Sequence, residues 1–137
     1  MAQRETRHNI GVVLGSYHKQ EMMEMLEEVR KVARECGLNI VREVWVPGSM
    51  EKPLAIKRML MSDDINGVVV LGLIERGETK HGLVMGEAVF SAIIRLQLEI
   101  GKPVGVGILG PEILPEQIPS RLKPHAQAAV RAVEAML

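Results

Sequence analysis

The sequence predicts one α/β domain built on a four-stranded parallel sheet. Short apolar runs alternate four times along the chain with segments whose apolar residues recur every three or four positions. Continuous apolar runs are typical of strands covered on both faces, and the alternation favours parallel strands joined by helices. With 137 residues, of which 47% are hydrophobic, the chain is large enough to bury one core.

Eight elements are expected after a short polar leader. Residues 1–8 are predicted to form a flexible tail, and residues 9–137 a single domain. The elements follow in this order: strand 10–14, helix 22–36, strand 39–46, helix 52–61, strand 67–74, helix 83–100, strand 102–109 and helix 116–137.

Glycine and proline mark the ends of the elements in the first half of the chain. The first apolar run stops at Gly15, and Gly37 ends a helix whose apolar residues recur at helical spacing. The second run is rich in β-branched residues and continues into Pro47, which favours a turn. Pro53 lies in the first turn of the next helix, where proline is well tolerated.

The helix at 83–100 carries apolar residues around nearly its whole circumference. A helix on the outside of a lone domain needs only one apolar stripe. We therefore expect a second buried side, against a neighbouring subunit. The alternative is a monomer with an unusually apolar surface.

Three glycines in the last strand match the spacing of a dinucleotide-binding motif. Gly105, Gly107 and Gly110 satisfy the pattern G-x-G-x-x-G. That motif must follow a strand and open a helix, whereas these residues fall within the strand and are followed by Pro111 and Pro115. We interpret them as sites of tight strand packing, not as a nucleotide site.

Composition excludes several classes of function. Seventeen basic and seventeen acidic residues cancel, so no electrostatic footprint for nucleic acid or an anionic membrane is expected. Cys36 is the single cysteine, which fits a reducing compartment. No apolar run suits a signal peptide or a membrane span, so a soluble, cytoplasmic protein is predicted. The four histidines lack metal-ligand spacing, and no metal is expected.

The segment Gly77–His81 is the strongest candidate for chemistry. It follows the third strand, and ligands of open parallel sheets bind beyond the carboxyl ends of the strands. The start of the next helix favours an anion such as phosphate near Thr79. The same helix end disfavours a charged imidazole, so His81 could act as a neutral general base. Alternatively, Thr79 only caps the helix and His81 is polar surface.

Three segments carry a further signal: VPGSMEKPLAIKRML (46–60), GLIERGETKHGLVMGEA (72–88) and KPVGVGIL (102–109). Together they resemble the 6,7-dimethyl-8-ribityllumazine synthase family. The resemblance implies a flavodoxin-like three-layer sandwich that assembles as pentamers or multiples of pentamers. It also implies a transferase of riboflavin biosynthesis with two small-molecule substrates and no cofactor. These substrates are 5-amino-6-(D-ribitylamino)uracil and 3,4-dihydroxy-2-butanone 4-phosphate.

The resemblance also assigns roles to individual residues. The family's catalytic histidine falls on His81, and its phosphate contacts fall on Glu78, Thr79 and Arg121, the last reaching in from an adjacent subunit. The segments that hold the pyrimidine fall on these residues: Tyr17, Ser49, Met50, Glu51, Leu73, Ile74, Glu75 and Val106.

Two other functions remain open from the sequence. One is that of the related archaeal-type riboflavin synthase, which shares the fold but lacks this Gly-x-Thr-x-His segment. The other is a shell-forming homologue that binds a ligand without turnover. Met50 and Glu75 suit the second case, because the family usually has Phe and an apolar residue at these two places.

Overall fold

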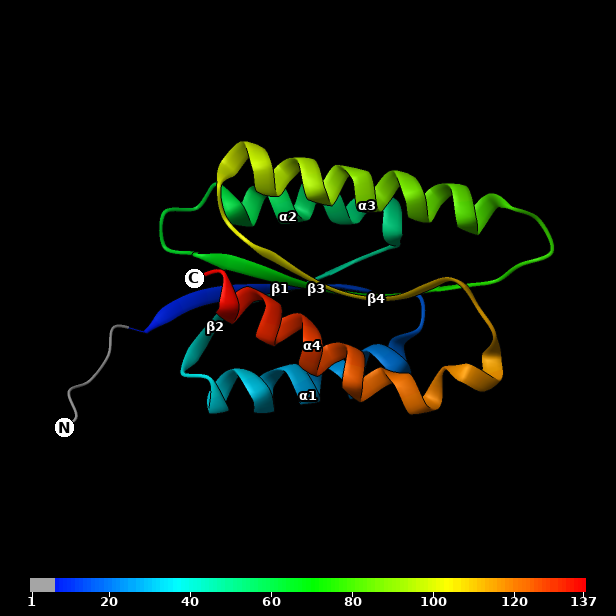
Figure 1. Ribbon diagram of the computed structural model, residues 1–137, viewed down its shortest axis with the longest axis horizontal. Coiled ribbons are helices and arrows are strands. Elements are labelled where there is room, and N and C mark those ends of the chain that lie inside the picture. Colours follow the sequence, from blue (N-terminus) through cyan, green and yellow to red (C-terminus); the bar gives the residue numbers. More distant parts are fainter. Residues whose placement is uncertain (1–6) are drawn as a thin grey trace.

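Four parallel strands form one sheet with the order β2-β1-β3-β4 (Figure 1). The computed structural model describes residues 7–137. The strands span these residues: β1 His8–Gly15, β2 Leu38–Val46, β3 Gly67–Glu75 and β4 Val104–Ile113. The structure confirms the predicted four-stranded parallel sheet.

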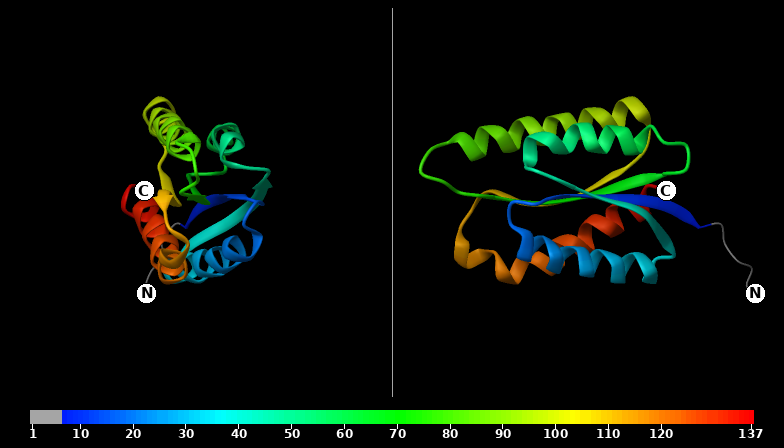
Figure 2. Two further views of the ribbon diagram at one scale, coloured as in Figure 1. Left: turned by 90° about the vertical axis from the view of Figure 1, so that its right-hand side faces the viewer. Right: turned by 180° about the vertical axis from the view of Figure 1, so that it is seen from behind.

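Two helices cover each face of the sheet, which makes three layers when the molecule is viewed end-on (Figure 2). One layer contains α2 and α3, and the other contains α1 and α4. The helices span these residues: α1 Lys19–Glu35, α2 Lys52–Leu60, α3 His81–Ile100 and α4 Leu122–Ala135. Short 3-10 turns occupy these residues: η1 Ser49–Glu51, η2 Pro115–Gln117 and η3 Pro119–Arg121.

The sheet buries both of its faces, which explains the continuous apolar runs of the sequence. Successive residues of β1 alternate between the layers: Val12 packs with the α1 and α4 side chains, and Val13 with those of α2 and α3. The strand β3 behaves in the same way, since Val69 belongs to the first cluster and Val70 to the second. Side chains of parallel strands point to opposite faces in turn, so the apolar pattern is continuous instead of alternating.

Two boundaries differ from the sequence prediction. The strand β1 begins at His8, inside the expected tail, and residues 1–6 of that tail lie outside the described part of the chain. The last helix begins at Leu122, not near residue 116. Pro115 and Pro119 each open a 3-10 turn, because proline lacks the N–H that a continuous helix would need there.

The glycines of β4 allow close packing, as interpreted from the sequence. A Cβ on Gly105 would overlap the backbone carbonyl of Ala129 in α4. A Cβ on Gly107 would approach Leu71 Cδ2 to 2.8 Å and the Ala129 Cβ of α4 to 3.3 Å. These contacts place α4 almost directly on the backbone of the strand.

The helix α3 buries one side and exposes apolar residues on the other. Ile93 is fully buried against the sheet, whereas Val84, Ile94 and Leu98 are 62%, 56% and 80% exposed. Leu54 of the neighbouring α2 is also exposed. The outer surface of this helical layer therefore exposes four large apolar side chains among charged ones such as Glu87 and Arg95. Over residues 7–137, no helix combines the length and hydropathy that crossing a membrane requires.

Candidate active site

A cavity of about 620 Å³ opens where β1, β2 and β3 end. It is lined by residues that follow each of these strands within a few positions, among them Tyr17, Ser49 and Arg76. The strand order reverses direction between β1 and β3, and ligands of open α/β sheets bind at this kind of position. The cavity therefore lies where the fold predicts a small-molecule site.

His81 and Thr79 enter the cavity from the turn between β3 and α3. His81 is the first residue of α3, and its backbone N–H donates to the Thr79 hydroxyl oxygen at 3.3 Å. Thr79 thus satisfies one free N–H at the helix start while it also lines the cavity. The two interpretations of Thr79, as a helix cap and as part of a site, are compatible in this geometry.

The η1 turn brings Ser49 and Glu51 to the same cavity. Tyr17 stands at its mouth, 86% exposed, with its ring edge-on to that of His18 and the ring centres 5.6 Å apart. An exposed tyrosine at a cavity mouth presents a flat face on which a planar ligand could stack. The β3 side of the wall is formed by three more residues with assigned roles, Leu73, Ile74 and Glu75.

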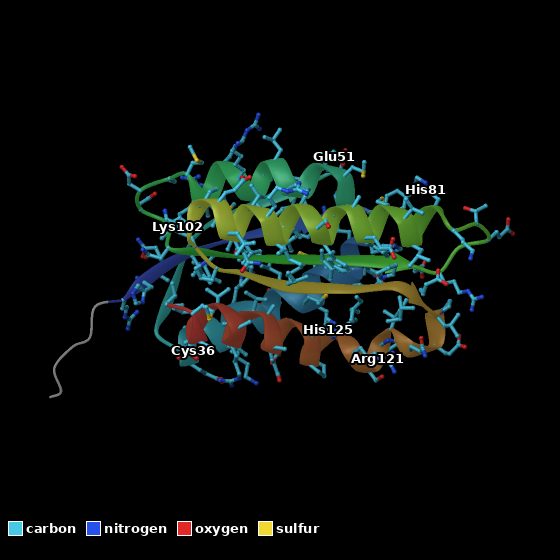
Figure 3. The ribbon with its side chains drawn as sticks, turned by 45° about the horizontal axis from the view of Figure 1, so that its top comes forward. Cys36, Glu51, His81, Lys102, Arg121 and His125 are labelled. Atoms are coloured by element: carbon cyan, nitrogen blue, oxygen red, sulfur yellow. The ribbon has the colours of Figure 1, made fainter. Side chains whose placement is uncertain are left out.

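Four residues with assigned roles lie away from the cavity lining. Met50 is 64% exposed, and Glu78 is exposed in the loop before α3. Val106 packs within β4 against the α2 and α3 cluster. Arg121 stands at the start of α4, in the opposite helical layer from His81 (Figure 3). Arg121 and His81 of the same chain are therefore separated by the sheet.

Lys52 is a residue of this cavity that the sequence interpretation missed. Its side chain is only 2% exposed, yet it lines the cavity between Gly15 and Gly72. A Cβ on Gly15 would lie 3.4 Å from Nζ, and a Cβ on Gly72 would overlap it. Burial lowers the pKa of Lys52 from 10.5 to about 8. Helical spacing was the available signal, because Lys52 shares a face with the buried Ile56 and Met59.

The other charged groups of the site lie nearer to solvent. Glu51, Glu75 and Arg76 line the cavity and are exposed, and Arg76 approaches Glu112 at 3.6 Å. Outside the cavity, burial and the nearby Arg121 charge lower the pKa of His125. Within residues 7–137, no group of three or more His, Cys, Asp or Glu side chains is arranged to hold a metal ion.

The fold and the cavity define a parallel α/β protein with a small-molecule site that combines an imidazole, a hydroxyl and a buried amine. The family model for 6,7-dimethyl-8-ribityllumazine synthase matches residues 7–137. The chain belongs to this family. A protein of that name from Picrophilus torridus is 42% identical over 102 residues, covering 74% of this chain and 75% of its own length.

Two further relatives with the same name match over more of the chain. The protein from Staphylothermus marinus is 35% identical over 128 residues, covering 93% of this chain and 85% of its own length. The protein from Methanopyrus kandleri is 36% identical over 128 residues, covering 93% of this chain and 90% of its own length. The similarity therefore extends across the whole domain.

Proposed function

We propose that this protein is a 6,7-dimethyl-8-ribityllumazine synthase, a transferase of riboflavin biosynthesis. One observation carries the proposal: His81 and Thr79 meet Ser49 and Glu51 in one cavity at the carboxyl edge of the sheet. In sequence these two pairs belong to the two motifs that the family resemblance rests on. The family match over residues 7–137 supports the same conclusion.

The proposed reaction joins an amine to a ketone. The 5-amino group of 5-amino-6-(D-ribitylamino)uracil condenses with the carbonyl of 3,4-dihydroxy-2-butanone 4-phosphate, and water leaves. Phosphate is then eliminated, and the ring closes with loss of a second water. Each step moves protons, and a positioned imidazole such as His81 can carry them. Bringing two reactants together in one cavity supplies further rate enhancement.

We assign the pyrimidine to the wall formed by η1 and the end of β3, with Tyr17 stacking on the ring. Backbone and side-chain groups at Ser49 and Glu51 suit the polar edge of a uracil. The phosphate is assigned to the turn at Glu78 and Thr79, because the start of α3 offers free backbone N–H groups.

The proposed site is completed by a second copy of this chain. Arg121 lies in the opposite layer from His81, so a guanidinium contact to the phosphate would come from a neighbouring subunit (Figure 3). The exposed Val84, Ile94 and Leu98 on α3 supply an apolar surface suited to such an interface. We therefore propose a pentamer, or a multiple of pentamers. We also propose that the protein is located in the cytoplasm. The neighbour's Val106, on the outermost strand β4, would contact the pyrimidine.

The test is to mix the purified protein with both substrates and to record the absorbance of the lumazine product. Its appearance with turnover establishes the activity. Substrate binding without product would instead indicate a non-catalytic homologue. Conversion of added lumazine to riboflavin would indicate a riboflavin synthase, a function that the family match does not favour.

A further inference from the structure

We propose that Lys52 is a catalytic amine, whose Nζ forms a Schiff base with the carbonyl of the keto substrate before the pyrimidine amine takes over that carbon. The inference rests on the proposed function and deepens it. It assigns to the site a covalent step on a residue of this chain, within the same cavity as His81 and Thr79.

The first support is the place of the amine. The Lys52 side chain is 2% exposed, yet it lines the cavity. Its end lies against Gly15 and Gly72, both of which also line the cavity and neither of which has a side chain to cover it. Gly15 and Gly72 thus leave room for the Lys52 amine in the wall of the cavity.

The second support is the lack of a protein partner for this amine. Within residues 7–137, Lys52 Nζ makes no hydrogen bond or ion pair with another residue. Lys102 shows how this chain holds a lysine with a structural role. Its Nζ donates to the carbonyl oxygens of Leu60, Ser62 and Ile65, at 2.9, 3.0 and 2.8 Å. Lys52 lacks such acceptors, which leaves its Nζ available to a ligand.

The third support is the chemical state of the amine. Removal from water disfavours the ammonium form, and burial is the cause of the lowered pKa of Lys52, about 8. About a tenth of the side chains would then be neutral at pH 7, against fewer than one in a thousand for an ordinary lysine. A desolvated, neutral lysine is the form that attacks a carbonyl.

The step balances without any other reactant. Nζ attacks the ketone carbon, the carbonyl oxygen leaves as water, and a C=N bond joins Lys52 to the substrate. The 5-amino group of the pyrimidine then attacks this carbon, the C–N bond to Nζ breaks, and the free amine returns. No electrons are gained or lost overall. His81, in the same cavity, is positioned to move the protons between the two amines and the departing water.

Reductive trapping tests the proposal directly. The protein is incubated with 3,4-dihydroxy-2-butanone 4-phosphate and sodium cyanoborohydride, digested, and analysed by peptide mass spectrometry. A Schiff base predicts one stable adduct, with the mass of the substrate less one oxygen atom, on the peptide that contains Lys52. Labelling spread over exposed lysines, with none on Lys52, would overturn the proposal.

Two variants make the test independent of surface labelling. Lys52→Met keeps the length of the buried chain up to Cε and should abolish the adduct and slow lumazine formation by about tenfold or more. Lys57→Met removes an exposed lysine of the same helix and should change neither. Full activity in Lys52→Met would overturn the proposal.

The outcomes also separate this proposal from the proposed function. Lumazine formation by the wild type without an adduct on Lys52 would leave the function standing and reject the covalent step. An adduct on Lys52 without lumazine formation would support the reactive amine and reject the synthase activity.

Discussion

The amine of Lys52 occupies the space that a side chain would take at Gly72. A Cβ built on Gly72 would overlap Nζ but would remain 3.4 Å from Lys52 Cε, an ordinary contact distance. The Lys52 side chain therefore conflicts with a side chain at position 72 only through its Nζ atom. This relationship links the backbone of β3 to the position of the Lys52 amine in the cavity.

Gly72→Ala should destabilise the wild type by about 1–2 kcal/mol, because the amine must leave its place between two glycines. In the Lys52→Met background the same substitution should be almost neutral, since methionine ends where Cε ends. Urea unfolding of the four proteins in a double-mutant cycle should give a coupling energy of at least about 0.5 kcal/mol. Strictly additive effects would show that the two positions do not meet.

Lys52→Met should stabilise the protein at neutral pH. A shift of the Lys52 pKa from 10.5 to about 8 corresponds to about 3 kcal/mol of folding free energy, with burial as its cause. Below pH 8 the folded and unfolded states both hold the proton, so this penalty is constant. Between about pH 8 and 10.5 only the unfolded state holds it, and the wild type gains stability as the pH rises.

The gain in unfolding free energy of Lys52→Met over the wild type should therefore shrink as the pH rises from about 8 to 10.5. Urea unfolding at pH 7 and at pH 9.5, at one protein concentration, measures it. An advantage that stays constant or grows with pH would contradict the burial of a titrating amine.

His81→Ala should slow lumazine formation by about 10²-fold, at the low end for a positioned acid–base group. The effect is expected to be modest, because holding the reactants together still accelerates the condensation. Steady-state measurement of kcat with both substrates saturating is the test. An unchanged kcat would remove His81 from the mechanism.

Arg121→Lys should weaken the binding of the butanone phosphate while leaving the pyrimidine affinity nearly unchanged. A guanidinium forms two parallel hydrogen bonds with a phosphate, which an ammonium cannot reproduce. Calorimetric titration with each substrate separately measures the difference. An equal loss for both would indicate damage to the fold.

A mixing experiment tests whether Arg121 acts across a subunit boundary. Arg121→Ala and His81→Ala subunits, unfolded together and refolded as a mixed assembly, should regain activity. In a ring of equally mixed subunits, roughly a quarter of the sites would combine an intact His81 with an intact Arg121. Activity no higher than that of the separate variants would place both residues in a single-chain site.

Ile94→Glu should disrupt the assembly and the activity together, because Ile94 belongs to the exposed apolar surface of α3. Burying a carboxylate at an interface without a partner costs several kcal/mol. Sedimentation velocity and the lumazine assay are the two measurements. A fully active Ile94→Glu monomer would contradict the shared site. Ile93→Glu serves as a contrast, since Ile93 is fully buried within its own chain and its variant should fail to fold.

Much of the fold could be predicted from the sequence, because buried strands and helical spacing leave local patterns. The alternation of apolar runs predicted four strands in a parallel sheet, and the structure confirms it. The predicted start of α4, near residue 116, was wrong by several residues, because the helix begins at Leu122. Pro115 and Pro119 favour short 3-10 turns, and the apolar pattern alone does not separate such turns from a helix.

The candidate site was only partly visible in the sequence. His81 and Thr79 stood out because they follow the third strand at the carboxyl edge of the sheet, where ligands of open parallel sheets bind. The place of Lys52 could not be inferred from its type, since lysine is almost always exposed. Its burial depends on Gly15 and Gly72, which are distant in sequence and meet it only after folding. Which apolar residues of α3 are buried within the chain also needed the structure, which buries Ile93 and exposes Ile94.

The contact between Gly105 and Ala129 fixes more than the packing of one helix. The carbonyl oxygen of Ala129 fills the space that a Cβ on Gly105 would take, so α4 packs directly on the backbone of β4 at this point. Arg121 lies eight positions before Ala129, about 12 Å along a helix axis. A methyl group added at Gly105 would push α4 away from the sheet. The Arg121 guanidinium, at the start of this helix, would move with it. In the proposed ring, where Arg121 would contact the phosphate of the adjacent subunit, Gly105→Ala should therefore weaken phosphate binding at that neighbouring site.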